Sequence, residues 1–334
     1  MKKIILVLSL LFSLLGILRS FFFVFYDFEE VTEFLNFIVF RIQPYGFAGM
    51  DIYVPRHLIN GNAEGGSISM GLINLSFFLT FLSGTIIYYF SKYKETKLLV
   101  FNYSLMFLDS IIKVFYFIAL FNISKLRVYD VLYIIVTLLY IFIPYYFITK
   151  ELNPNIIDND NQITESNLDN SSNSKRFINL LIDSFVIIVI VFGFISYAER
   201  NQESASVFTY FRMVFGDKFA AIAFFCTIKF IYYLVFESIF KTTPAKAITA
   251  CNVIDEEGNS PNFSIILKRT LLRFVPFESF SFLMGKNLHD DYSDTYVVNK
   301  KIDRKIEDRY TLFLAVAFGI LIVTYFFMSS RYPY

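Results

Sequence analysis

Tryptophan is absent from this chain, and cysteine and histidine each occur only twice. Cys226 lies in an apolar run and Cys251 in a polar segment, so neither a disulfide framework nor a cysteine cluster is indicated. His57 and His289 are far apart in the sequence, and a zinc site would need further ligands at set spacing. The sequence therefore predicts no metal and no cofactor.

Charge is also sparse in this chain. Charged residues make up 18% of it and the net charge is +1, so no basic surplus favours nucleic acid as a partner. The sequence has no glycine-rich phosphate loop, no Ser or Cys nucleophile beside a His and no His-x-x-x-His pair. We therefore predict that the protein is not an enzyme and does not bind nucleic acid.

Apolar residues are abundant instead, making up 56% of the chain in clustered runs. A helix of about 20 apolar residues crosses the ~30 Å hydrocarbon core of a bilayer. The runs predict an all-α, polytopic helical membrane protein with about seven transmembrane helices, at 4–26, 70–90, 98–121, 130–149, 177–199, 219–240 and 310–328. The first run resembles a signal peptide, but it continues through 21–23 without a cleavage site, which favours an uncleaved anchor.

Lys and Arg near the runs predict the orientation, because they accumulate on the cytoplasmic side. They are concentrated in the short segment 91–97 and the long segment 241–309, which favours N-in/C-out topology. We therefore expect two bundles separated by a polar, disordered linker. Their predicted bounds are 1–150 for a four-helix bundle with an outer loop at 27–69, 151–174 for the linker, and 175–334 for a three-helix domain with a cytoplasmic loop at 241–309.

A polar stripe opens the fifth run. Arg176, Asn179 and Asp183 share one helical face, and a charge in hydrocarbon costs ~2.5–3.5 kcal/mol on insertion scales. If the runs 177–199 and 219–240 are neighbouring antiparallel helices, Asp183 lies at a depth in the bilayer similar to that of Lys229, and Arg176 similar to that of Glu237. These depths suggest the ion pairs Asp183–Lys229 and Arg176–Glu237. Such pairs either fix helix register or form an ion- or proton-exchange site.

Charged residues recur in two other apolar stretches. Asp109 and Lys113 have the i, i+4 spacing of a helical ion pair, and they either neutralise each other or face a polar path. Lys268, Arg269 and Arg273 interleave with apolar residues, which suggests an interfacial or re-entrant helix and candidate sites for lipid headgroups.

Five motifs follow one another in the C-terminal half. They are Arg176 with Asp183, FESIFKTTPAK (236–246) with Thr243 and Lys246, VIDEEGNSPNF (253–263), the basic Arg269 and Arg273, and LHDDYSDTYVV (288–298) with His289, Asp290 and Thr295. Together they resemble the RDD family, bacterial membrane proteins named for one Arg and two Asp, over about 175–300 and with an extension to the C-terminus left open. The first four runs carry no such resemblance.

The resemblance implies that Arg176, Asp183 and Asp290 form the family motif. Ala245 and Asp294 stand where the family has Gly, so Ala245 is expected to remove a residue with positive φ. We expect Asp290 to pair with a basic residue such as Lys246 or Arg273 and so fold the loop back onto the helix ends.

Three functions remain open at this point. The leading one is a transport-related, ion- or proton-coupled protein of the bacterial inner membrane, in which Asp183 responds to the ion. The alternatives are a non-catalytic accessory or assembly subunit and an anionic-lipid-binding protein. The expected partners are the lipid bilayer and either other membrane proteins or a second copy of the chain.

Overall fold

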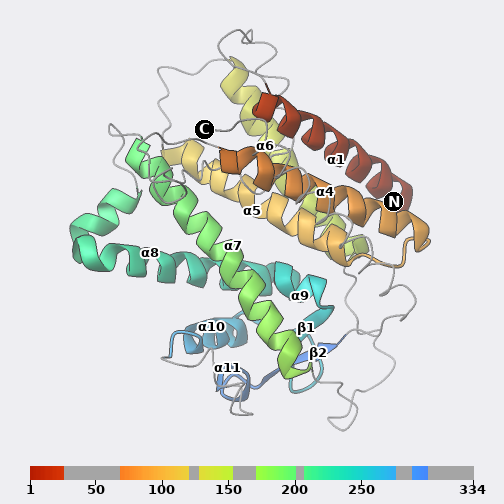
Figure 1. Cartoon of the computed structure of the whole chain (residues 1–334). Helices are drawn as coiled ribbons and strands as arrows, with labels where there is room; N and C mark the ends of the chain where they lie inside the picture. Colours follow the sequence, from red (N-terminus) through yellow and green to blue (C-terminus); the bar gives the residue numbers. More distant parts are fainter. Residues whose placement is uncertain (26–67, 120–127, 153–170, 201–206, 276–287, 300–334) are drawn as a thin grey trace. The chain divides into compact units, whose positions relative to one another are not determined.

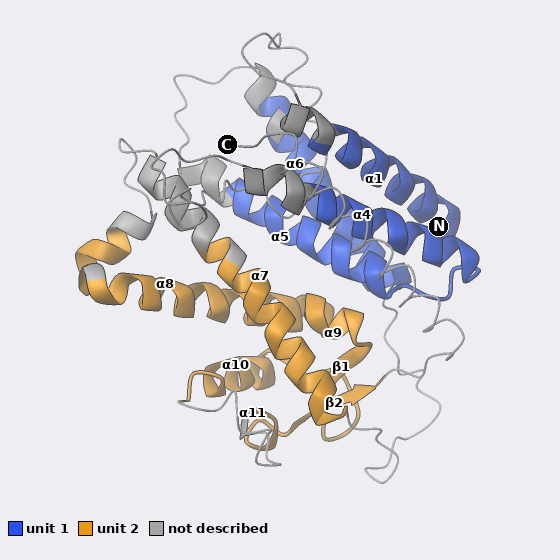
Figure 2. Cartoon of the chain, in the orientation of Figure 1, with its two compact units in different colours: residues 1–152, 302–334 blue, residues 153–301 orange. Residues whose placement is uncertain are grey.

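The computed structural model describes residues 1–25, 68–119, 128–152, 171–200, 207–275 and 288–299. These residues are mostly helical (Figure 1). The chain divides into two compact units, Met1–Leu152 with Ile302–Tyr334 and Asn153–Lys301 (Figure 2). The predicted outer loop, linker and last span fall largely or entirely on residues outside the described ranges.

The first unit is a bundle of helices that pack against their neighbours in chain order. Its helices are α1 (Lys2–Phe25), α4 (Ile68–Phe90), α5 (Lys97–Ala119) and α6 (Val128–Phe147), which continues as a π-helical turn η4 (Ile148–Leu152). α1 packs on α4, α4 on α5, and α5 on α6. Gly16 permits the first contact, because a Cβ there would lie 2.1 Å from the ring of Phe78.

Two pairs of polar side chains lie inside this bundle. Ser9 of α1 and Tyr103 of α5 share a 2.7 Å hydrogen bond between buried oxygens. The predicted ion pair between Asp109 and Lys113 is confirmed. Both contacts remove polar groups from an otherwise apolar interior, where an unpaired group would be costly.

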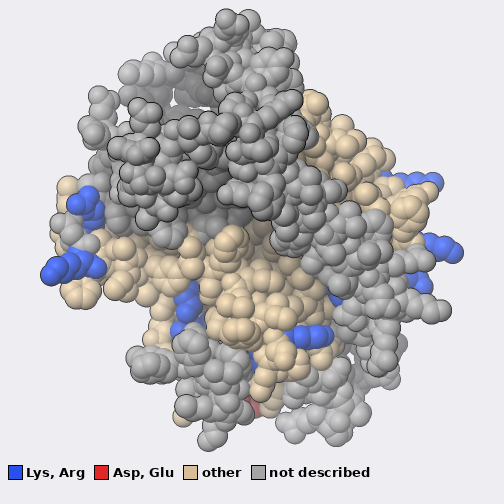
Figure 3. All heavy atoms as spheres, in the orientation of Figure 1, with Lys and Arg blue, Asp and Glu red and all other residues tan. Residues whose placement is uncertain are grey.

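Apolar side chains are exposed on the outer helix faces. On α1, exposed Ile4, Val7, Leu11, Leu14 and Leu18 recur at helical spacing, which is typical of a face turned to lipid. On the side of the molecule shown in Figure 3, uncharged residues make up most of the described surface, with Lys and Arg in separate patches.

The second unit begins with two long helices. α7 spans Asn173–Arg200 and α8 spans Val207–Phe240, with a break at Gly216. Gly216 has φ 72° and ψ 161°, a conformation that L-residues rarely adopt. Two described helices are long and apolar enough to cross a bilayer, Ile134–Leu152 and Lys218–Phe240. Six of the seven predicted runs coincide with helices, but the number that spans the membrane remains a prediction.

The segment after α8 is a small folded structure. It comprises α9 (Pro244–Ile248), β1 (Cys251–Asp255), α10 (Phe263–Leu272), α11 (Leu288–Asp291) and β2 (Thr295–Asn299). The two strands pair antiparallel with Val253 opposite Val297. The prediction of a mainly helical fold is confirmed. The prediction of an all-α fold is wrong, because β1 and β2 form a two-stranded sheet. The strands were missed because each is only five residues long and half-buried.

Candidate functional site

The polar stripe of α7 faces the folded segment that follows α8. Arg176 forms an ion pair with Asp290 of α11. One turn on, Asn179 accepts a 2.6 Å hydrogen bond from the hydroxyl of Thr249. Asp183 lies one further turn along the same face. The predicted stripe therefore has partners, and they come from a segment far along the chain.

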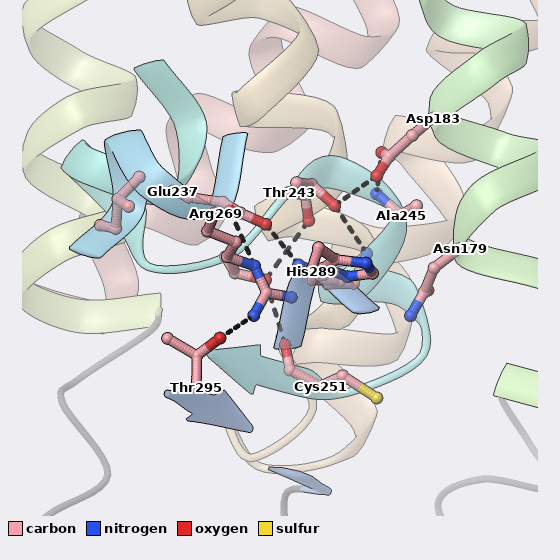
Figure 4. Close-up of polar contacts among 12 residues, drawn as sticks. Asn179, Asp183, Glu237, Thr243, Ala245, Cys251, Arg269, His289 and Thr295 are labelled. Atoms are coloured by element: carbon pink, nitrogen blue, oxygen red, sulfur yellow. Dashed lines mark hydrogen bonds and ion pairs between the residues drawn. The ribbon is translucent and has the colours of Figure 1, made fainter. Parts of the chain in front are cut away.

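Asp183 is held by neutral donors. Its carboxylate accepts a 2.7 Å hydrogen bond from the Tyr232 hydroxyl. It also accepts hydrogen bonds of 2.7 Å from the Thr243 hydroxyl and 3.2 Å from the backbone N–H of Ala245 (Figure 4). The side chain is buried and forms no ion pair with any residue that the structure describes. Two neighbouring elements, α8 and α9, are thus tied to one carboxylate of α7.

The sequence TTPAK explains why α9 begins beside Asp183. Thr243 is an extended N-cap that accepts a hydrogen bond from the backbone N–H of Lys246, and Pro244 occupies the first turn. The Thr243 hydroxyl therefore caps α9 while it donates to Asp183. Ala245 lies inside this helix and has no positive φ. Asp294, the other departure from the family, does have positive φ, 54°.

Glu237 is the centre of a buried charge network. It forms ion pairs with Lys246, with Arg269 at 3.3 Å and with Arg273 at 2.8 Å. The carboxylate is fully buried. Its three cations come from α9, α10 and the residue that ends α10, so one acidic side chain of α8 holds the folded segment together.

Asp290 is the second acid of this network. It pairs with Arg176, Arg269 and His289. Arg269 therefore bridges Asp290 and Glu237, and its position beside Glu237 is shown in Figure 4. Burial alone would raise the pKa of Asp290, but the adjacent Arg269, His289 and Arg176 hold that pKa well below its ordinary value. Asp290 is therefore ionised at neutral pH and acts as a fixed anion.

Lys246 is the cation of the network that is easiest to discharge. Burial lowers its pKa from 10.5 to about 8, although the attraction of Glu237 opposes the shift. When Lys246 loses its proton, Arg269 and Arg273 still neutralise Glu237. The network can thus release one proton near neutral pH without leaving its central anion unpaired.

This lowered pKa predicts that Lys246 contributes stability as the pH rises. Between about pH 8 and 10.5 the unfolded chain binds the Lys246 proton and the folded chain does not, so Lys246 should add ~1–3 kcal/mol to the free energy of unfolding. Lys246→Met should remove this contribution. Lys268→Met, at an exposed position, should retain it. Thermal unfolding followed by circular dichroism at pH 7.5, 9 and 10 measures the difference, and an unchanged slope in Lys246→Met would contradict it.

The two predicted helix-to-helix pairs are wrong. Asp183 does not pair with Lys229, whose ammonium lies 5.4 Å from the ring centroid of Phe274. Arg176 pairs with Asp290 and not with Glu237. α7 and α8 do meet, and Tyr232 of α8 binds Asp183, but the charged partners of Arg176 and Glu237 come from α9, α10, α11 and the residue that ends α10.

The structure also corrects the predicted headgroup residues and the predicted partners of Asp290. Arg269 and Arg273 are buried in ion pairs, so of the three proposed headgroup residues only Lys268 is exposed. Asp290 pairs with basic residues, as predicted. Its partners are Arg269 and Arg176, however, rather than the predicted Lys246 or Arg273. Lys268 itself faces Asp294 at 3.6 Å.

Sequence reasoning missed Tyr232 and Thr249 and gave Thr243 no role. Thr243 had a detectable signal, because Thr followed by Pro predicts a helix N-cap. Tyr232 had none, since its partner Asp183 lies 49 residues away. Within the described ranges, no group of three or more His, Cys, Asp or Glu is placed to hold a metal ion.

Comparison with known proteins gives one match. The RDD family model matches residues 171–332. Neither the curated proteins nor the solved structures gave a match to this chain. The matched residues include Arg176, Asp183 and Asp290 and the whole charge network described above. The C-terminal half of the chain therefore belongs to the RDD family, a family of membrane proteins.

Proposed function

We propose that this chain is a multi-pass protein of the cell membrane with a transport role, coupled to a proton or a small cation at Asp183. One observation carries the proposal: Asp183 is buried on a hydrophobic helix and is held only by two hydroxyls and one backbone amide among the described residues. Ionisable groups within membrane helices are rare and typically mark ion or proton pathways.

The chemistry of these donors supports exchange. A carboxylate paired with Arg or Lys is already neutralised, and a proton or cation must displace its partner. Asp183 can accept either one by rotation of the Tyr232 and Thr243 hydroxyls, which both donate and accept hydrogen bonds. The same Thr243 oxygen caps α9. Binding of a proton or cation at Asp183 therefore changes the hydrogen bonding at the start of that helix.

Asp183→Asn tests the proposal, since it preserves the shape of the side chain and removes the titratable group. In proteoliposomes that contain a pH-sensitive dye, wild-type protein should carry protons against an imposed cation gradient, and Asp183→Asn should reduce the flux at least tenfold. Asp294→Asn removes an exposed carboxylate of the same unit and should leave the flux unchanged.

Two results would refute transport through Asp183. Equal flux in wild type and Asp183→Asn, with equal folded yield, would separate the carboxylate from any transport. Absence of flux in the wild type across Na⁺, K⁺ and Li⁺ gradients would favour the accessory-subunit alternative. Circular dichroism of each variant establishes that the compared proteins are folded.

A further inference from the structure

α10 has its charged and apolar sides reversed relative to a helix on the surface of a soluble protein. Arg269 and Arg273 point inward and are 0% and 8% exposed. Phe263, Leu271 and Val275, just past the end of the helix, are 59%, 55% and 45% exposed. In water this arrangement would bury the charges and solvate the apolar side chains, which is unfavourable on both counts.

Contacts along α10 show where this helix lies beside α8. Arg269 pairs with Glu237, Arg273 stacks 3.8 Å from the ring centroid of Tyr233, and Phe274 lies 6.3 Å from the centroid of Phe230. As residue numbers rise on α10, they fall on α8. The two helices therefore run antiparallel, side by side (Figure 1).

The contact with Phe230 fixes a depth. The apolar part of α8 is Lys218–Phe240, which has the length and composition of a membrane span. At 1.5 Å per residue, Phe230 lies about 15 Å from the Phe240 end of a span that is about 34 Å long. Phe274, two residues beyond the end of α10, thus reaches nearly the middle of that span, far beyond an interfacial position at its end.

We propose that α10 is a re-entrant helix, which enters the bilayer beside α8 from the Phe240 side and presents its outer face to lipid acyl chains. The hydrocarbon of the bilayer is the occupant of the face formed by Phe263, Leu271 and Val275. On the neighbouring α8, Ile231 and Ile239 are also exposed.

The charge network makes such an insertion feasible. An isolated Arg in hydrocarbon is costly, but Arg269 and Arg273 are neutralised by Glu237 and, for Arg269, by Asp290. Lys268, 56% exposed, precedes Arg269 and Arg273 in the chain and is therefore the shallowest of the three basic residues. Its long side chain can extend toward the headgroups while its methylene groups remain among acyl chains.

The absence of Trp from the chain allows a direct test. Single variants Phe263→Trp, Leu271→Trp and Val275→Trp are reconstituted in vesicles whose acyl chains carry bromine at shallow or deep positions. Ile231→Trp on α8 serves as the deep reference, and Glu257→Trp in the exposed turn after β1 as the aqueous reference. Quenching by deep bromine should increase from Phe263→Trp through Leu271→Trp to Val275→Trp, with Val275→Trp close to Ile231→Trp.

Three outcomes would overturn the proposal. Equal, shallow quenching at the three positions would place α10 flat on the membrane surface. Quenching by aqueous iodide at the level of Glu257→Trp would place the face in water. Protection from both quenchers would mean that protein covers it. If Val275→Trp fails to fold, the comparison of Phe263→Trp with Leu271→Trp decides, because both side chains are exposed and tolerate the larger ring.

Discussion

Replacement of Glu237 by Gln should destabilise the protein by about 3–5 kcal/mol. The change preserves the shape of the side chain but removes a negative charge that directly contacts Lys246, Arg269 and Arg273. Three buried cations would then repel one another without a central anion. Loss of one partner from a buried ion network costs more than the network itself contributes, because the remaining charges stay desolvated.

A buried thiol provides the measurement. Cys251 is fully buried, so in a Cys226→Ala background a thiol-reactive fluorescent dye reports thermal unfolding in detergent. Glu257→Gln, in an exposed turn, is the control and should melt as the parent does. The double variant Glu237→Gln/Arg273→Gln should melt above Glu237→Gln, because it also removes one of the buried cations that lost their anion, while Arg269 keeps Asp290. A single variant as stable as the control would show that the network adds nothing to stability.

The correct predictions came from the spacing of residues within single helices. Long apolar runs predicted the helices, because chain length and hydrophobicity alone determine which segments can cross hydrocarbon. The shared face of Arg176, Asn179 and Asp183 and the pair Asp109–Lys113 follow from the helical repeat, which requires no tertiary information. These features are properties of single helices.

The partners could not be predicted in the same way. Asp183 binds groups 49, 60 and 62 residues away, and nothing in the spacing of a single sequence indicates such distances. Lys229 had the right depth on α8 for an ion pair, but depth does not determine which way a helix face points. The acid that gathers the cations proved to be Glu237, which the sequence had assigned to Arg176.

α10 shows why Arg269 and Arg273 were misread as candidate sites for lipid headgroups. An amphipathic pattern indicates two faces, but the pattern alone does not tell which one is buried in protein. Basic residues were taken as the outer face because Lys and Arg commonly contact headgroups. Glu237 and Asp290 are buried acids, and they hold Arg269 and Arg273 on the inner face of α10. Lys268 faces the exposed Asp294 and is itself exposed, as the sequence predicted.

Replacement of Asp290 by Asn should cost about 3–5 kcal/mol, and Arg176→Gln should cost less. Without Asp290, both Arg176 and Arg269 lose an anion, whereas without Arg176 the carboxylate of Asp290 still contacts Arg269. The two changes should therefore be non-additive in the double variant, with a coupling of ~0.5–3 kcal/mol. Asp291→Asn, at the exposed neighbouring position, is the matched control and should be neutral.

The pH dependence separates this ion pair from a packing effect. Because the pKa of folded Asp290 lies below its ordinary value, its stabilising contribution is fully present above about pH 4, near the pKa of an unperturbed Asp, and is lost as the pH falls further. Wild type and Asp290→Asn should thus converge in stability on acidification, while Asp291→Asn should follow the wild type throughout. A difference between wild type and Asp290→Asn that stays constant from pH 7 to pH 3 would mean that shape, rather than charge, joins the start of α7 to α11. In that case the first Arg and the last Asp of the motif would act as packing groups and not as a buried ion pair.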